Sequence, residues 1–145
     1  MGLTLTATSQ KTFAQSLRVN GLRPTKQRAC VYSVILEKRD HPTADDIFDR
    51  VKKHLPGTSF ATVYNCLETL VACGLVKQVN FDRSPTRYCP NLTPHAHFKC
   101  THTGQIHDIE IDEDTLSRMY ALIPEGFMTE NIDLSFSGLE KPIKN

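Results

Sequence analysis

The 145-residue chain has no apolar run near the length of about 18 residues that a membrane span needs. Its first ten residues also lack the charged-then-apolar layout of a secretory signal peptide. We therefore expect a cytoplasmic protein with no membrane partner. In that compartment, its five cysteines favour metal binding, thiol chemistry or redox sensing over a framework of disulfides.

The motifs of common enzymes are absent as well. The sequence has no H-E-x-x-H pair, no glycine-rich phosphate loop and no nucleophile motif. A zinc ion held by histidines with one open position could still be catalytic. However, no residue stands out as its general base. We therefore expect that the protein is not an enzyme.

The net charge of +1 conceals two halves of opposite sign. Residues 1–89 carry 13 Lys and Arg against 7 Asp and Glu, a net +6, whereas residues 90–145 carry 4 against 9, a net −5. This split indicates a module that binds a polyanion, followed by a module with another task. A chance fluctuation of surface charge is the alternative, because six charges over 89 residues is a modest excess.

Apolar periodicity and capping signals predict a run of helices in the basic half. Two short strands follow, at residues 75–81 and 86–89, around a turn at residues 82–85. Helices followed by a β-hairpin are the layout of a winged helix, which places its recognition helix in the major groove of DNA. A generic helical core with a solvated basic face is the alternative. The predicted helices cover residues 11–19, then 26–38 after a Thr25 cap, 44–54 after a Thr43 cap, and a last stretch from a Thr58 or Ser59 cap to residue 73.

Polar and basic side chains occur where a winged helix would contact DNA. Thr62, Tyr64 and Asn65 lie in the first turns of the predicted recognition helix, and Tyr64 and Asn65 would read base edges. Basic side chains mainly set affinity through phosphate contacts. Those around the Thr25 cap and on the hairpin are Arg23, Lys26, Arg28, Lys77, Arg83 and Arg87, with the polar Gln27 among them.

The acidic half predicts strands at residues 95–100, 105–111 and 127–136, and a helix at residues 113–123 capped by Asp112. Fewer than sixty residues bury little core alone, so we expect this half to dimerise. The predicted fold class is therefore α+β. An N-terminal winged-helix DNA-binding domain, residues 1–89, precedes a small α/β dimerisation domain, residues 90–145.

Cysteine, histidine and aspartate cluster around the junction of the two halves. His95 and His97 are two residues apart, so on a strand both side chains leave the same face and can bind one ion. Cys89 lies six residues before His95, and Asp108 could return on a neighbouring strand after a turn at Gly104. A thiolate, two imidazoles and a carboxylate suit a divalent transition metal. An H-x-H pair alone is a weak signal, because such histidines are often plain surface or core residues.

Several short motifs stand in order along the chain: G-L-R-P-T-K-Q-R at 21–28, H-P-T-A-D-D-I-F at 41–48, A-T-V-Y-N-C-L-E-T-L at 61–70, G-L-V at 74–76, and H-A-H-F-K-C at 95–100 followed by the segment 104–108. Together they resemble the ferric uptake regulator family over residues 11–138. The resemblance implies a dimeric winged-helix repressor that binds a palindromic DNA operator. A metal between its two halves would set the angle between the DNA-binding arms.

The resemblance also assigns residues by position. It adds His41 to the metal ligands, although from its place in a loop alone His41 is expected to be solvated. It makes Tyr64 a base-contacting residue and Arg23 a minor-groove contact. The regulatory metal site that it implies is His41, Cys89, His95, His97 and Asp108.

Two departures from the family bear on metal binding. Many members hold a structural zinc with two C-x-x-C pairs, but here Thr103 stands three residues after Cys100 and no cysteine follows. No all-cysteine structural zinc is therefore expected. We expect one divalent metal per chain (zinc, iron or manganese), because a second site of some members would fall on Pro94, Ala96, Thr115 and Ile132.

The native metal and its signal stay open. The order C-x5-H-x-H resembles the zinc-sensing branch of the family, and the softness of the Cys89 thiolate favours zinc. His41 and Asp108 instead resemble the arrangement of the peroxide-sensing branch, which implies iron or manganese. A further alternative is a thiol- or haem-based redox sensor, in which Cys89 is oxidised or the dipeptide Cys89-Pro90 ligates haem iron.

Overall fold

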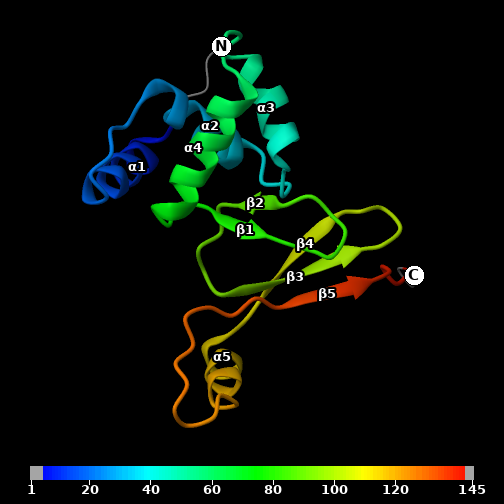
Figure 1. Ribbon diagram of the computed structural model, residues 1–145. Helices are drawn as coiled ribbons and strands as arrows, with labels where there is room; N and C mark the ends of the chain where they lie inside the picture. The colour runs from blue at the N-terminus through cyan, green and yellow to red at the C-terminus, as the bar shows by residue number, and fades with distance from the viewer. Residues whose placement is uncertain (1–4, 143–145) are drawn as a thin grey trace. The chain divides into compact units, whose positions relative to one another are not determined.

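The computed structural model describes residues 5–142, and the chain divides into two units, Met1–Leu92 (unit 1) and Thr93–Asn145 (unit 2) (Figure 1). Among the described residues, unit 1 contains α1 (Ala7–Val19), α2 (Lys26–Glu37), α3 (Ala44–Lys52), α4 (Phe60–Ala72), β1 (Lys77–Val79) and β2 (Arg87–Cys89). Unit 2 contains β3 (His95–Cys100), β4 (Ile106–Glu110), α5 (Glu113–Tyr120) and β5 (Ser135–Gly138). No helix within residues 5–142 has the length and apolar character that crossing a bilayer would require.

Three helices of unit 1 begin at the capping residues that the sequence predicts, whereas α1 begins at Ala7 after a Thr6 cap, four residues before the predicted start. The Thr25 side chain accepts a hydrogen bond from the backbone N–H three residues on, and Ser59 does the same for α4. Thr43 forms a capping box with Asp46, whose carboxylate accepts a hydrogen bond from the Thr43 N–H at 3.1 Å. Gly74 ends α4 with a φ of +74°, a conformation that glycine adopts without a steric penalty.

The core of unit 1 lies between its helices. α2, α3 and α4 pack against one another, and Phe13 and Leu17 add one face of α1. Cys66 is part of this core, and burial raises the pKa of its thiol. The fully buried side chains include Leu17, Val31, Val34, Ile35, Ile47, Val51, Val63, Leu67, Leu70, Leu75 and Val76.

The β1–β2 hairpin is fastened to the loop that precedes α3. Arg87 of β2 forms an isolated antiparallel bridge with Thr43. The Tyr88 N–H donates to the Pro42 carbonyl at 2.9 Å, and the Arg87 guanidinium donates to the His41 carbonyl at 3.0 Å. Helices followed by this antiparallel hairpin confirm the predicted winged helix. In this layout α4 has the position of the recognition helix of a winged helix, and the hairpin has the position of its wing.

The described part of unit 2 contains a three-stranded sheet in the order β4-β3-β5, and α5 lies between β4 and β5 in the sequence. β3 pairs antiparallel with β4 and parallel with β5. Ala96 and Cys100 are its buried apolar side chains among the described residues, and α5 buries none. Large apolar side chains are exposed instead, namely Ile109, Tyr120, Leu122, Ile123, Phe127, Met128, Phe136 and Leu139.

The predicted last strand is too long. β5 covers only Ser135–Gly138, whereas a strand was expected over residues 127–136. In the observed register His97 lies opposite Ser135, so residues 127–132 would extend beyond the start of β3 at His95. Phe127 and Met128 are accordingly 74% and 86% exposed. The predicted helix over residues 113–123 also ends early, at Tyr120.

Candidate metal centre

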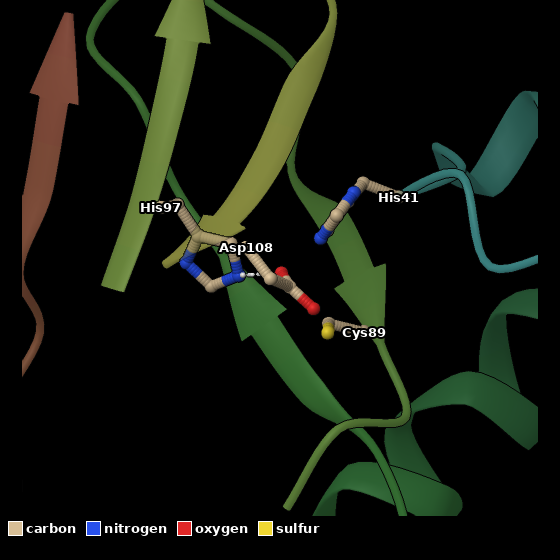
Figure 2. A group of neighbouring side chains, drawn as sticks. All are labelled: His41, Cys89, His97 and Asp108. Atoms are coloured by element: carbon tan, nitrogen blue, oxygen red, sulfur yellow. Dashed lines mark ion pairs between the residues drawn. The ribbon is translucent and has the colours of Figure 1, made fainter. Parts of the chain in front are cut away.

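Three donor side chains of unit 2 converge at one end of the β3–β4 hairpin. His95 and His97 leave the same side of β3, and Asp108 lies directly opposite His97 in the antiparallel register. The Nε2 atom of His97 is 3.3 Å from Asp108 Oδ1, an ion pair drawn in Figure 2. His95 Nε2 lies 3.7 Å from the same oxygen and 3.0 Å from His97 Nε2. The expected strands therefore bring these two imidazoles and this carboxylate together.

The tautomer of His95 follows from its surroundings. Its Nδ1 atom is 2.7 Å from the Thr93 carbonyl oxygen, which can only accept a hydrogen bond. His95 Nδ1 therefore carries a proton, so in the neutral imidazole the lone pair is on His95 Nε2, the atom that lies near His97 and Asp108. A carbonyl that orients an imidazole in this way is a common companion of histidine metal ligands.

The spacing and burial of these donors fit a bound ion. Two ligand atoms on a tetrahedral zinc ion lie about 3.3 Å apart, given zinc–nitrogen distances of about 2.0–2.1 Å. The distances among His95, His97 and Asp108 span 3.0–3.7 Å. The His95 side chain is 2% exposed, His97 12% and Asp108 34%, so the two imidazoles are largely shielded from water.

Unit 1 carries a second pair of donors, His41 and Cys89, whose side chains are also drawn in Figure 2. His41 precedes Pro42 in the loop between α2 and α3, and Cys89 ends β2. Both residues are buried, at 6% and 3% exposure, and a ligand atom of each lies within 4.8 Å of the other. An imidazole and a thiol at this spacing are borderline-to-soft donors suited to zinc.

The backbone of His41 has an unusual conformation. Its φ of +55° lies in the left-handed region, which non-glycine residues adopt rarely and at an energetic cost. Two hydrogen bonds hold this turn against β2. The Arg87 guanidinium donates to the His41 carbonyl, and the Tyr88 N–H donates to the Pro42 carbonyl. Asp40, the preceding residue, accepts two hydrogen bonds from the Arg50 guanidinium, at 2.9 and 2.7 Å. Sequence reasoning missed these supporting residues, since nothing in their spacing shows that they surround His41.

The residues predicted to contact DNA lie in two regions of unit 1. Tyr64 and Asn65 are exposed on α4, and Arg23 and Gln27 are exposed around the start of α2. Two others have contacts within the protein as well. Arg28 donates to the Arg23 carbonyl at 2.8 Å, and the hydroxyls of Thr62 and Ser59 are 3.0 Å apart.

The remaining histidines of unit 2 stand apart from the donor cluster. His107 Nε2 lies 3.0 Å from a carboxylate oxygen of Glu140, near the end of the chain. His102 is exposed in the turn after β3. Cys100 is buried at the end of β3, and Thr103 stands where a second thiolate of a C-x-x-C pair would be.

Comparison with known proteins identifies a family that matches most of this chain. The model of the ferric uptake regulator family matches residues 19–137. The chain belongs to the ferric uptake regulator family. This membership confirms the resemblance that the sequence motifs indicate, and with it the α+β class.

Known members of the ferric uptake regulator family resemble the chain over much of its length. A peroxide-responsive repressor from Staphylococcus aureus is 35% identical over 95 residues, which are 66% of this chain and 64% of the relative. The chain thus matches slightly under two thirds of the length of this curated relative. A solved peroxide stress regulator from Campylobacter jejuni is 28% identical, with a TM-score of 0.70 over 88% of this chain and 96% of that one.

A more distant structure shares the fold. The ferric uptake regulator of Helicobacter pylori, described with three functional metal binding sites, has a TM-score of 0.76 at 22% identity. The match covers 97% of this chain and 95% of that one. These relatives are regulators rather than enzymes, in line with the missing catalytic motifs.

The Asp40–Arg50 pair makes stability depend on pH. The hydrogen bonds from Arg50 lower the pKa of the Asp40 carboxyl, so the pair stabilises the fold above the ordinary carboxyl pKa of about 3.9. This contribution is lost as the pH falls through the lowered pKa. Because Asp40 is 39% exposed, we expect at most about 1 kcal/mol. Asp40→Asn should therefore lose less free energy of unfolding than the unsubstituted protein between pH 7 and pH 2, measured by urea denaturation.

Asp49→Asn is the matched control for this measurement. It removes a carboxylate of α3 whose side chain is 71% exposed. Equal effects of Asp40→Asn and Asp49→Asn on the pH dependence of the free energy of unfolding would contradict this prediction. The two hydrogen bonds between Asp40 and Arg50 would then not stabilise the loop that contains His41.

Proposed function

We propose that the protein is a metal-dependent, DNA-binding transcriptional repressor that acts as a homodimer on a palindromic operator. The observation that carries this proposal is the convergence of His95, His97 and Asp108 within 3.0–3.7 Å, in a chain that also contains a winged helix. Membership of the ferric uptake regulator family supports both parts.

On this proposal, ligands from both units bind one divalent ion per chain. His95, His97 and Asp108 provide the donors of unit 2, and His41 and Cys89 provide those of unit 1. A bound divalent cation supplies the positive charge that lets these donors share one point. The thiolate of Cys89 favours zinc among the candidate metals.

The positions of His41 and Cys89 suggest how metal binding reaches the DNA-binding residues. His41 lies in the loop that leads into α3, and Cys89 ends the wing strand β2. The contacts from Arg87 and Tyr88 join this loop to the wing. Ligands attached to both elements restrict the winged helix as a whole when they bind the same ion as unit 2. Two winged helices restricted in this way fit two half-sites of an operator.

The DNA contacts follow the geometry of the winged helix. Tyr64 and Asn65, exposed on α4, read base edges in the major groove. Thr62 lies in the first turn of the same helix. Arg23, Gln27 and Arg28 contact the backbone or a groove edge, with Arg23 directed to the minor groove. The apolar side chains exposed on unit 2 supply the surface through which two chains associate.

A second candidate is peroxide sensing with iron or manganese at the same ligands. The names of the relatives from Staphylococcus aureus and Campylobacter jejuni favour this signal. The Cys89 thiolate favours zinc, so the ligation of Cys89 separates the two candidates.

An anaerobic cobalt(II) titration of the metal-free protein tests the ligands. We expect saturation at one ion per chain and a thiolate-to-cobalt absorption band that Cys89→Ser removes. His97→Ala should weaken cobalt binding by at least about 100-fold, because even the loss of a residue that only supports a metal ligand lowers metal affinity by about 10–100-fold.

Two substitutions serve as matched controls. Cys73→Ser and His102→Ala change a half-buried thiol and an exposed imidazole outside the proposed ligand set, and both should bind cobalt like the unsubstituted protein. One ion without the thiolate band would favour iron or manganese and peroxide sensing. The absence of saturable binding would contradict the metal-dependent repressor.

DNA binding provides the functional test. Duplexes selected from a random pool by the zinc-loaded protein should bind about 5–150-fold more weakly after a chelator is added. Asn65→Ala should cost about 1–3 kcal/mol and relax the sequence preference, whereas Arg23→Ala should weaken binding to all duplexes and reduce the salt dependence. Arg118→Ala, on α5, is the control. Equal affinities with and without chelator, measured by fluorescence anisotropy, would rule out metal-dependent binding.

A further inference from the structure

An aromatic cluster lies at the start of the recognition helix. The ring of Phe60, the first residue of α4, meets Phe48 of α3 edge-on, with centroids 5.5 Å apart and planes at 80°. The Phe60 ring also stacks with Tyr64, with centroids 6.4 Å apart and planes at 23°. The Lys52 ammonium lies 4.6 Å from the centre of the Phe48 ring. Phe48, Phe60 and Tyr64 therefore form one continuous group, the aromatic cluster.

Phe48 packs against the core of unit 1, but packing of the core does not explain the position of Phe60. Val63, Cys66, Leu67 and Leu70 already form the buried face of α4, whereas Phe60 is 41% exposed. Phe60 stands one helical turn before Tyr64, so the two side chains are neighbours on the same face. With contacts to two neighbouring rings, the Phe60 ring is a preorganised apolar surface on the outside of unit 1.

The surroundings of the aromatic cluster favour nucleic acid over an apolar protein partner. Residues 1–89 carry a net charge of +6, and the Lys52 cation lies against the cluster itself. Tyr64 is one of the two residues for which the sequence predicts contact with a base. The apolar group that the major groove displays beside the polar base edges is the C5-methyl group of thymine.

We propose that Phe60 is a specificity-determining residue that contacts the methyl group of a thymine next to the base contacted by Tyr64. Phe48 acts as a positioning residue that holds the Phe60 ring. This inference rests on the proposed function, because it requires that α4 enters the major groove of an operator.

Deoxyuridine substitution tests this inference, because it removes the thymine methyl group and changes no hydrogen-bonding group. The duplex is one selected by the zinc-loaded full chain, with each thymine of the half-site replaced in turn, symmetrically in both halves. We expect one replacement to weaken binding about fourfold per half-site, or about fifteenfold in all, the effect of exposing one methyl group at each. At the position where this replacement weakens binding, Phe60→Ala should bind the thymine and deoxyuridine duplexes equally. At every other thymine, Phe60→Ala should respond to the replacement like the unsubstituted protein.

Phe60→Leu is the second variant, because leucine keeps an apolar contact and should keep part of the discrimination. The thermal unfolding midpoint of both variants shows that they fold. If Phe60→Ala responds to deoxyuridine like the unsubstituted protein at every thymine, Phe60 does not read a methyl group and the inference is wrong, although the repressor stands. If the unsubstituted zinc-loaded protein selects no duplex, the proposed function fails, and the inference fails with it.

Discussion

The close approach of three Lewis bases, His95, His97 and Asp108, on one small sheet is the constraint on which the proposed metal site depends. The Nε2 atom of His95 lies near His97 Nε2 and the Asp108 carboxylate, and the distances among the three groups are 3.0–3.7 Å. Grouped donors with little access to water are costly unless a proton or a cation lies among them. Because the Thr93 carbonyl fixes the proton of His95 on Nδ1, the side of the ring that faces the cluster is available to a cation.

The small sheet can present these donors because it is not organised around a large core. Unit 2 buries Ala96 and Cys100 among its described apolar side chains and leaves many others exposed. A unit of this kind gains stability from association and from bound ligands. In unit 1 the balance differs, because an extensive core supports the left-handed turn at His41 through the contacts from Arg87 and Arg50. The strain at His41 is therefore located where a bound ion would benefit from a rigid donor.

Local signals explain most of what the sequence predicts correctly. Thr25, Thr43 and Ser59 begin helices because a side-chain oxygen three residues before a backbone N–H is a local interaction. The two-residue spacing of His95 and His97 likewise determines that both side chains leave one face of a strand.

Long-range pairing explains most of what the sequence does not reveal. The length of β5 depends on which residues of β3 it meets, about 38 positions earlier in the chain, as in the pair Cys100–Gly138. The turn at His41 depends on a bridge from β2, some 44 positions away. Only resemblance to a family pointed to His41 as a ligand, because a loop histidine before proline carries no signal of its own.

The central claim is that one ion takes ligands from both units. X-ray absorption spectroscopy at the zinc edge of the protein loaded with one equivalent of zinc tests it most directly, because sulfur and imidazole ligands scatter differently. We predict a single zinc environment that contains one sulfur, at about 2.3 Å, together with imidazole nitrogens at about 2.0–2.1 Å. On the proposed ligand set, this sulfur would belong to Cys89 of unit 1, and two of the imidazoles to His95 and His97 of unit 2. A shell of nitrogen and oxygen alone, unchanged by Cys89→Ser, would contradict it.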